Sequence, residues 1–317
     1  MAQTFKIGTR GSKLALYQAN LVADKLRAAH SDLEVEIVEI NTSGDWKPSE
    51  GEVRLSDAAG GKGQFAKEIE SALMDGRIDC GVHSMKDMPS FLPDGLVINH
   101  ILPRADARDA FLSNGHKTLD DLPQGAVVGT ASLRRQAFIL ARRPDLKIVP
   151  FRGNVPTRIQ KLRDGQVDAT LLALAGLQRL ELEHELSSVM SEEEMLPAAG
   201  QGAIGVEIRE GDEQSKELLD AIHCCETGLR VAAERAALQV LDGSCHTPIG
   251  AYATLDGQDM HLTVAVGRLD GQEMHMVEDR LTLSDETSHC EQVYKLGETL
   301  GQRLKDKIPP ELLEQCA

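Results

Sequence analysis

Three junctions between a predicted strand and the following helix carry residues suited to binding anions. Free backbone N–H groups at the amino end of a helix attract anions, and the helix dipole adds to that attraction. An arginine there adds a planar fork that grips a carboxylate or phosphate at two points. The junctions are Gly8-Thr9-Arg10-Gly11-Ser12, Gly129-Thr130-Ala131-Ser132-Leu133-Arg134-Arg135 and Arg152-Gly153-Asn154. Because α/β folds bind ligands at strand ends, these junctions predict a carboxylate or phosphate site.

The segment 130–180 is basic within an acidic chain. It contains eight Arg and two Lys against three Asp, a formal charge of 10 − 3 = +7, whereas the whole chain carries −16. Crowded like charges destabilise a fold, so we expect a bound polyanion to offset them. The alternative is that Ser12, Ser132 and Asn154 are only helix N-caps with solvated arginines nearby.

Two further motifs could do chemistry of another kind. Asp87, beside Lys86, follows a predicted buried strand, where a carboxylate could stabilise a cationic intermediate or shuttle protons. The alternative for this pair is an exposed ion pair. Cys245 lies in a turn-forming loop next to His246, which could favour its thiolate and make it a nucleophile or a covalent attachment point. The alternative there is a structural surface cysteine.

Metal and nucleotide sites are weaker interpretations. His223, Cys224, Cys225, Cys245 and His246 are zinc-ligand types, but the adjacent Cys224 and Cys225 lack the usual gap between ligands. We therefore expect no metal. The run Gly60-Gly61-Lys62-Gly63 suggests a phosphate loop, but it lacks the full P-loop spacing.

Composition limits the class of protein. At 317 residues the chain is long enough for two or three domains, and 41% hydrophobic with 26% charged residues is typical of a soluble globular protein. Aromatic residues make up 3%, which together with the negative charge argues against nucleic-acid binding.

No apolar run is long enough for a membrane span, and no secretory signal is evident. The six cysteines favour a reduced cytoplasmic protein, and we expect a monomer.

The predicted elements alternate between strand and helix, as in an α/β fold. The first half has expected strands at 6–8, 33–37 and 78–82 and helices at 14–26 and 65–73, with a long loop at 43–63. A second series has strands at 126–128, 148–149 and 168–174 and helices at 132–143 and 155–163, the second capped by Gly165. Residues 200–205 suggest a crossing between domains. The tail has helices at 227–241 and 291–304 and strands at 251–254 and 261–266, which predict a small α+β domain.

The motifs, in order, resemble those of the porphobilinogen deaminase family over residues 5–305. They are Thr9-Arg10-Gly11-Ser12-Lys13-Leu14-Ala15-Leu16, Gly60-Gly61-Lys62-Gly63, Val82-His83-Ser84-Met85-Lys86-Asp87-Met88-Pro89, Ser132-Leu133-Arg134-Arg135-Gln136, Arg152-Gly153-Asn154-Val155, Ala175-Gly176-Leu177, Gly200-Gln201-Gly202-Ala203 and Gly243-Ser244-Cys245. Long motifs in a fixed order make the resemblance specific.

The resemblance implies an α/β fold of three domains. Two would have the fold of type II periplasmic binding proteins, one formed by 1–101 with 201–220 and the other by 102–200. A small α+β domain, 221–317, would carry a dipyrromethane cofactor joined to Cys245 by a thioether. The implied enzyme is a transferase. It deaminates and condenses four porphobilinogen molecules head to tail and releases hydroxymethylbilane for tetrapyrrole biosynthesis.

The resemblance also assigns roles to residues. Asp87 and Lys86 would be catalytic, with Asp87 stabilising positive charge on a pyrrole nitrogen and assisting proton transfer. The expected cofactor-binding residues are Cys245, Arg134, Arg135, Ser132, Lys86, Asp87, Thr130 and Gly202. The expected substrate-binding residues are Arg10, Ser12, Arg152, Arg158, Arg179, Lys62, Phe65 and Gln201.

Some positions depart from the family pattern or lie outside it. The family often has a Lys where this chain has Ser56-Asp57-Ala58-Ala59, and often a Ser at the position of Ala131. Arg142, Arg143 and Arg163 lie outside the motifs and are expected to be solvated. The alternative function is an anion-binding protein of the same fold without catalysis. Such a protein would need neither Cys245 nor Asp87, and it would usually carry an export signal.

Overall fold

The first domain is built on a mixed five-stranded sheet. The computed structural model describes residues 4–42, 66–241 and 247–314. The first sheet has the strand order β2-β1-β3-β10-β4. Its strands are β1 (Thr4–Arg10), β2 (Glu34–Ile40), β3 (Cys80–Ser84), β4 (Leu96–Ile101) and β10 (Ile204–Arg209). The first three run parallel, and β10 runs antiparallel to β3 and β4.

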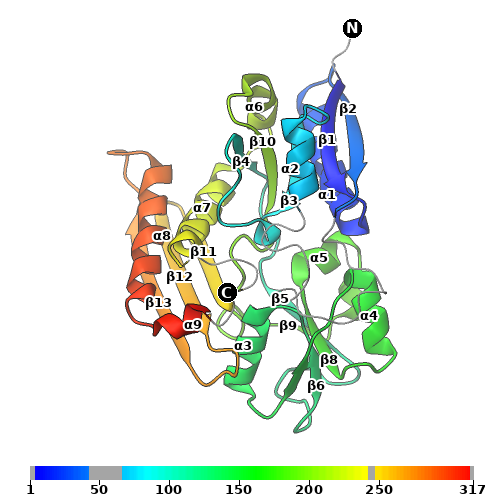
Figure 1. The fold of residues 1–317 in the computed structure, drawn as a ribbon, viewed down its shortest axis with the longest axis vertical. Helices are drawn as coiled ribbons and strands as arrows, with labels where there is room; N and C mark the ends of the chain where they lie inside the picture. The colour runs from blue at the N-terminus through cyan, green and yellow to red at the C-terminus, as the bar shows by residue number, and fades with distance from the viewer. Residues whose placement is uncertain (1–3, 43–65, 242–246, 315–317) are drawn as a thin grey trace.

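Helices cover both faces of this sheet. Helix α1 (Lys13–Ala29) buries Ala19, Val22, Ala23 and Leu26, whose spacing forms one apolar stripe along a helix. The stripe shares a core with α6 (Glu213–Asp220), and α2 (Lys67–Met74) packs in a separate cluster. In Figure 1 this domain is drawn in blue and cyan, with β10 and α6 in yellow-green beside it.

The second domain repeats this architecture. Its sheet has the strand order β7-β6-β8-β5-β9, in which β6, β7 and β8 are parallel and β5 is antiparallel to β8. The strands are β5 (Asp109–Ser113), β6 (Val127–Gly129), β7 (Lys147–Val149), β8 (Ala169–Ala173) and β9 (Ser188–Val189). Helix α3 (Leu133–Arg142) packs in one cluster, and α4 (Val155–Arg163) and α5 (Leu174–Arg179) pack in another.

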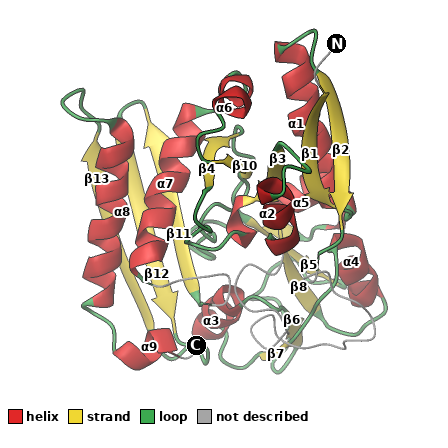
Figure 2. Ribbon diagram, turned by 45° about the horizontal axis from the view of Figure 1, so that its top comes forward, coloured by secondary structure: helices red, strands yellow, loops and turns green. Residues whose placement is uncertain are grey.

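The third domain is a small antiparallel sheet covered by helices. Strands β11 (Ile249–Asp256), β12 (Asp259–Gly267) and β13 (Met274–Thr282) pair in that order. Helices α7 (Cys225–Val240) and α8 (His289–Lys305) lie over the sheet, and the short α9 (Pro310–Glu314) follows (Figure 2). A Cβ at Gly297 would lie 2.2 Å from the carbonyl oxygen of Ala233, so glycine permits the close approach of α7 and α8.

The chain crosses twice between the first two domains, and a buried network holds the crossings to the third. Arg104 on the first crossing donates from Nε to the carbonyl of Gln201 at 2.9 Å, and from NH1 and NH2 to Glu234 at 2.6 and 3.1 Å. Glu234 on α7 also accepts from the backbone N–H groups of Gly200 and Ala253 at 2.7 and 2.8 Å. This network therefore joins both crossings to α7 and β11.

The predicted fold class is confirmed: two α/β domains and a small α+β domain. The helix predicted at 155–163 is α4, and Gly165 follows its C-cap with a φ of +74°. The pattern does not predict β13, because only Val277 is buried in that strand and the apolar alternation is lost. The predicted domain boundaries stay a prediction. No helix in the described part of the chain combines the length and apolar character that a membrane crossing requires.

Candidate active site

In the first domain, parallel strands bring predicted site residues to one edge of the sheet. Arg10 is the last residue of β1, and Ser12 caps α1 by accepting a hydrogen bond from the backbone N–H of Ala15 at 3.2 Å. Lys86 and Asp87 lie in the short 3-10 turn Met85–Asp87 that follows β3. Since β1 and β3 run parallel, their carboxyl ends place these four residues at the same edge.

The second domain presents a matching edge. Thr130 and Ser132 follow β6, Arg152 follows β7, and Arg179 ends the helix that follows β8. The hydroxyl of Thr130 accepts from the backbone N–H of Ser132 at 3.1 Å, and the hydroxyl of Ser132 accepts from that of Arg135 at 3.4 Å. Ser132 is therefore an N-cap, as its alternative interpretation proposed. The cap also sets the direction of the helix start.

The junction before α4 orders two more of the predicted arginines. Asn154 caps α4 by accepting from the backbone N–H of Thr157 at 3.0 Å. Arg158 donates from Nε to the carbonyl of Gly153 at 2.8 Å, which holds its side chain along the junction. Arg152 is buried, with only 4% of its surface exposed.

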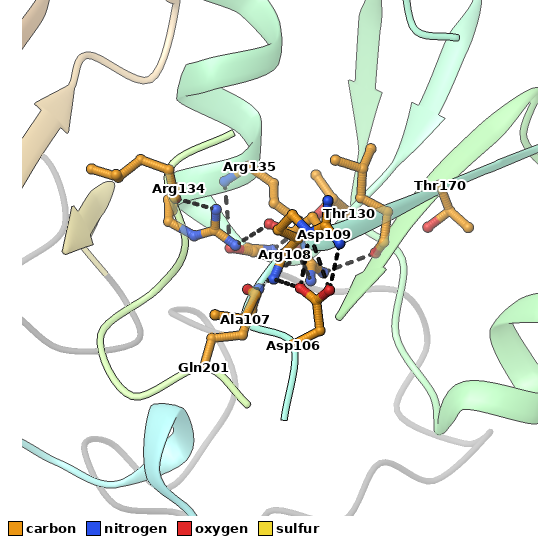
Figure 3. Close-up of polar contacts among 12 residues, drawn as sticks. Asp106, Ala107, Arg108, Asp109, Thr130, Arg134, Arg135, Thr170 and Gln201 are labelled. Carbon is orange, nitrogen blue, oxygen red and sulfur yellow. Dashed lines mark hydrogen bonds and ion pairs between the residues drawn. The ribbon is translucent and has the colours of Figure 1, made fainter. Parts of the chain in front are cut away.

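A carboxylate that the sequence analysis did not single out lies beneath the start of α3. Arg134 donates from NH2 to Oδ2 of Asp109 at 2.7 Å, and Arg135 donates from NH2 to Oδ1 at 2.6 Å (Figure 3). All three side chains are buried. Burial raises the pKa of Asp109, but the charges of Arg134 and Arg135 outweigh it and hold that pKa well below its ordinary value. The two arginines therefore share one anionic partner.

The turn that carries Lys86 and Asp87 is fixed by the second crossing. The backbone N–H of Met85 donates to the carbonyl of Ala203 at 3.1 Å, and Ser84 exchanges hydrogen bonds with Gln18 of α1 at 2.8 and 3.2 Å. Asp87 is half-buried and makes no hydrogen bond or ion pair with any residue that the structure describes. Its carboxylate is thus held on an ordered turn, and none of the described residues occupies its acceptor oxygens.

Lys86 of the first domain interacts electrostatically with charged residues of the second domain. The pKa of Lys86 is lowered to about 8, mainly by burial; the charges of Asp87 and Asp109 oppose this shift, and those of Arg135 and Arg134 add to it. The lysine of the first domain therefore lies within the electric field of the Arg134–Asp109–Arg135 group of the second domain. Together these side chains carry three positive charges against the two carboxylates of Asp87 and Asp109.

The second crossing brings Gln201 to this group, and Arg179 of α5 contacts the same crossing at Gly202. Gln201 donates from Nε2 to the carbonyl of Ala107 at 2.6 Å and to Oδ1 of Asp109 at 3.2 Å. Arg179 donates from NH2 to the carbonyl of Gly202 at 2.7 Å. Gly202 has a φ of +85°, and a Cβ there would lie 2.5 Å from the carbonyl oxygen of Ala105. Only glycine therefore allows the two crossings to lie this close together.

Acidic side chains outside the basic segment, residues 130–180, offset part of its positive charge. Arg142 pairs with Asp120 at 2.5 Å and Glu194 at 2.8 Å, and Arg163 pairs with Glu185. Arg143 pairs with Asp145 at 2.7 Å. The expectation that these three arginines are simply solvated is corrected, because most of their partners are acids distant in sequence.

Three predicted site residues, Cys245, Lys62 and Phe65, lie outside the described residues. The zinc interpretation also depended on Cys245 and His246, which lie there too. Within residues 4–42, 66–241 and 247–314, no cluster of three or more His, Cys, Asp or Glu side chains could hold a metal ion. One signal in the sequence could have indicated Asp109: it is an acidic residue directly before the apolar run of residues 110–112, which is buried in β5.

The fold and site define a class: two α/β domains with cationic strand-end sites, joined by two crossings, and a third domain tied to those crossings. A family model described as "Porphobilinogen deaminase, dipyromethane cofactor binding domain" matches residues 5–217, and "Porphobilinogen deaminase, C-terminal domain" matches residues 228–306. A chloroplastic porphobilinogen deaminase of Oryza sativa subsp. japonica is 54% identical over 258 residues, which cover 79% of this chain and 70% of that protein. The chain belongs to the porphobilinogen deaminase family.

Solved structures of other proteins overlap part of the chain. The methionine-binding protein MetQ is 18% identical, with a TM-score of 0.44, over 73% of this chain and 94% of its own. A double mutant of the VFT2 domain of Bordetella pertussis BvgS is 14% identical, with a TM-score of 0.43, over 69% of this chain and 86% of its own.

The residues present fit the dipyrromethane cofactor that the family model names. A dipyrromethane carries carboxylate side chains, and the site offers Lys86, Arg134 and Arg135 as cationic donors. The Nε of Arg134 is buried and makes no hydrogen bond within the described part of the chain, so its N–H is an unsatisfied donor there. An anion that reached these groups would satisfy that donor and offset their excess positive charge.

Proposed function

We infer that the chain is a hydroxymethylbilane synthase, a transferase of tetrapyrrole biosynthesis. It deaminates four porphobilinogen molecules and condenses them head to tail on a dipyrromethane cofactor, releasing hydroxymethylbilane. The observation that carries this function is the cationic group of Lys86, Arg134 and Arg135, which two domains build together in a chain of this family. Bound dipyrromethane would supply the primer to which the first substrate unit is joined.

The substrate's chemistry explains the number of cations. Each pyrrole carries an acetate and a propionate, so a chain of pyrroles is a polyanion. We propose that Lys86, Arg134 and Arg135, with Ser132, Thr130 and Gly202, hold the cofactor's carboxylates. Substrate carboxylates would be held by Arg10, Ser12, Arg152, Arg158 and Arg179. Lys62, Phe65 and Gln201 would also contact the substrate, with Lys62 and Phe65 covering it. Support comes from the placement of the described members at strand ends and on the second crossing.

We propose that Asp87 is the catalytic carboxylate, with Lys86 beside it. Loss of ammonia from porphobilinogen gives a cationic electrophile, and joining it to the next pyrrole places positive charge on pyrrole nitrogen. A carboxylate facing that nitrogen stabilises the charge and can accept a proton. Asp87 suits this role because its oxygens make no hydrogen bond or ion pair with the described residues.

Three finer statements are also proposals. The cofactor is joined to Cys245 by a thioether, since a loop cysteine can supply the required thiolate. The protein acts as a monomer. It works in the cytoplasm, although the rice relative is a chloroplastic protein.

Product stoichiometry tests the function. Purified protein incubated with porphobilinogen should consume four molecules and release four ammonia for each linear tetrapyrrole formed. Substrate loss, ammonia and product can be measured in one time course. Binding of porphobilinogen without ammonia release would instead favour a non-catalytic anion-binding protein.

The pH dependence of the reaction should report Lys86. The lysine is charged below its pKa of about 8 and loses that charge above it. If the charge binds carboxylates, kcat/KM should fall above about pH 8, approaching about tenfold per pH unit. Lys86→Arg should move this fall to higher pH, because a guanidinium stays protonated there. We call this fall of kcat/KM at high pH the alkaline limb. If the alkaline limb stays at the same pH in Lys86→Arg, a group other than Lys86 causes it.

A further inference from the structure

Asp109 is the buried centre of the contacts around the cationic group. It opens β5 and has no solvent-exposed surface. Its Oδ2 accepts from NH2 of Arg134 at 2.7 Å, and its Oδ1 accepts from NH2 and Nε of Arg135 at 2.6 and 3.2 Å (Figure 3). A single carboxylate therefore fixes two neighbouring guanidinium groups, one on each of its oxygens.

Each guanidinium is also held from a second side. Arg134 donates from NH1 to the carbonyl of Leu196 at 2.6 Å, and Arg135 donates from NH1 to the carbonyl of Leu171 at 2.8 Å. A planar fork held by two different acceptors has its orientation fixed. Its remaining N–H groups then point in set directions, among them the Nε of Arg134, which has no partner in the described part of the chain.

The same carboxylate contacts the crossings. Gln201 donates from Nε2 both to Oδ1 of Asp109 at 3.2 Å and to the carbonyl of Ala107 at 2.6 Å. Ala107 precedes β5 on the first crossing, and Gln201 lies on the second. Asp109 thus connects the orientation of the arginines to the segments that join the first two domains.

We propose that Asp109 is a positioning residue for the condensation: it aims Arg134 and Arg135 at the pyrrole carboxylates and ties their direction to the crossings through Gln201. This inference rests on the proposed function. Asp109 does not bind the pyrrole chain itself, because its negative charge would repel carboxylates. It acts through Arg134 and Arg135, which it contacts.

Two variants separate positioning from simple charge balance. Asp109→Glu keeps the buried negative charge but displaces the carboxylate by one methylene, and a misplacement of about 1 Å can lower a rate by about 100-fold. We expect its kcat/KM to fall at least about tenfold. Asp109→Asn removes the charge as well, and because Asp109 raises the pKa of Lys86, the alkaline limb should also move to lower pH. Where Asp109→Asn yields no folded protein, Asp109→Glu alone decides.

The matched control is Asp120→Asn. Asp120 also pairs with an arginine of α3, Arg142, but at the surface, with its side chain 52% exposed. This variant should keep the wild-type kcat/KM and alkaline limb. A second check uses Arg134→Gln: if Asp109 acts through Arg134, adding Asp109→Glu to that variant should lower kcat/KM by less than it does in the wild type.

Wild-type protein is measured first, by intact mass and by porphobilinogen turnover. If it carries no dipyrromethane and releases no ammonia, the proposed function fails, and the inference fails with it. If the wild type is active and folded Asp109→Glu matches its kcat/KM, only the positioning role is overturned. The positioning role of Asp109 is supported if Asp109→Glu lowers kcat/KM and Asp120→Asn does not. The same substitution should then lower kcat/KM by a smaller factor in the Arg134→Gln background.

Discussion

Asp87→Asn should fold and keep its cofactor but turn over porphobilinogen about 10²- to 10⁴-fold more slowly than the wild type, the usual contribution of a positioned acid–base group. The substitution keeps the shape of the side chain and removes its charge. Because Asp87 has no ion pair with any described residue, its loss should leave the fold intact. The positive charge that develops on the pyrrole nitrogen would then lack its carboxylate.

The measurement is kcat at saturating porphobilinogen, with the intact mass and thermal unfolding of the same preparations. Asp94→Asn is a matched control, because Asp94 is an exposed aspartate in the loop that follows the same turn. The control should have wild-type kcat. Near-normal turnover by Asp87→Asn would refute the catalytic role of this carboxylate.

Cys245→Ser should form no hydroxymethylbilane at a measurable rate, because its hydroxyl is a far weaker nucleophile than a thiolate and should not acquire the cofactor. It should also unfold at a lower temperature than the wild type. Without a bound anion, the three cations at Lys86, Arg134 and Arg135 have, among the described residues, the carboxylates of Asp87 and Asp109 as their anionic neighbours. An anion that binds the folded state alone stabilises it.

Cys290→Ser provides the control for this experiment. Cys290 is a free, exposed cysteine on α8, so its replacement should change neither activity nor unfolding temperature. Product formation by Cys245→Ser at the wild-type rate would contradict an essential thiol at position 245.

Local sequence patterns predicted the elements that hold the site. Ser12, Ser132 and Asn154 do cap α1, α3 and α4, because a short polar side chain before an amphipathic stretch satisfies the first free N–H groups. The strand-end location of Lys86 and Asp87 followed from the buried run before them, which is β3.

Long-range pairings could not be predicted in the same way. Asp109 is 25 residues from Arg134 in sequence, and no local pattern indicates which distant acid a buried arginine meets. Likewise, Arg104 and Glu234 are separated by 130 residues and meet only because α7 packs against the crossings. Periodicity shows which side chains are buried but not which buried charges pair.

The central claim is that this chain builds its product on a covalently bound dipyrromethane, and intact-mass measurement tests it most directly. Active wild-type protein should exceed the mass of its sequence by one dipyrromethane, and Cys245→Ser should lack that excess. A wild-type preparation that turns over porphobilinogen yet has only the mass of its sequence would contradict the claim.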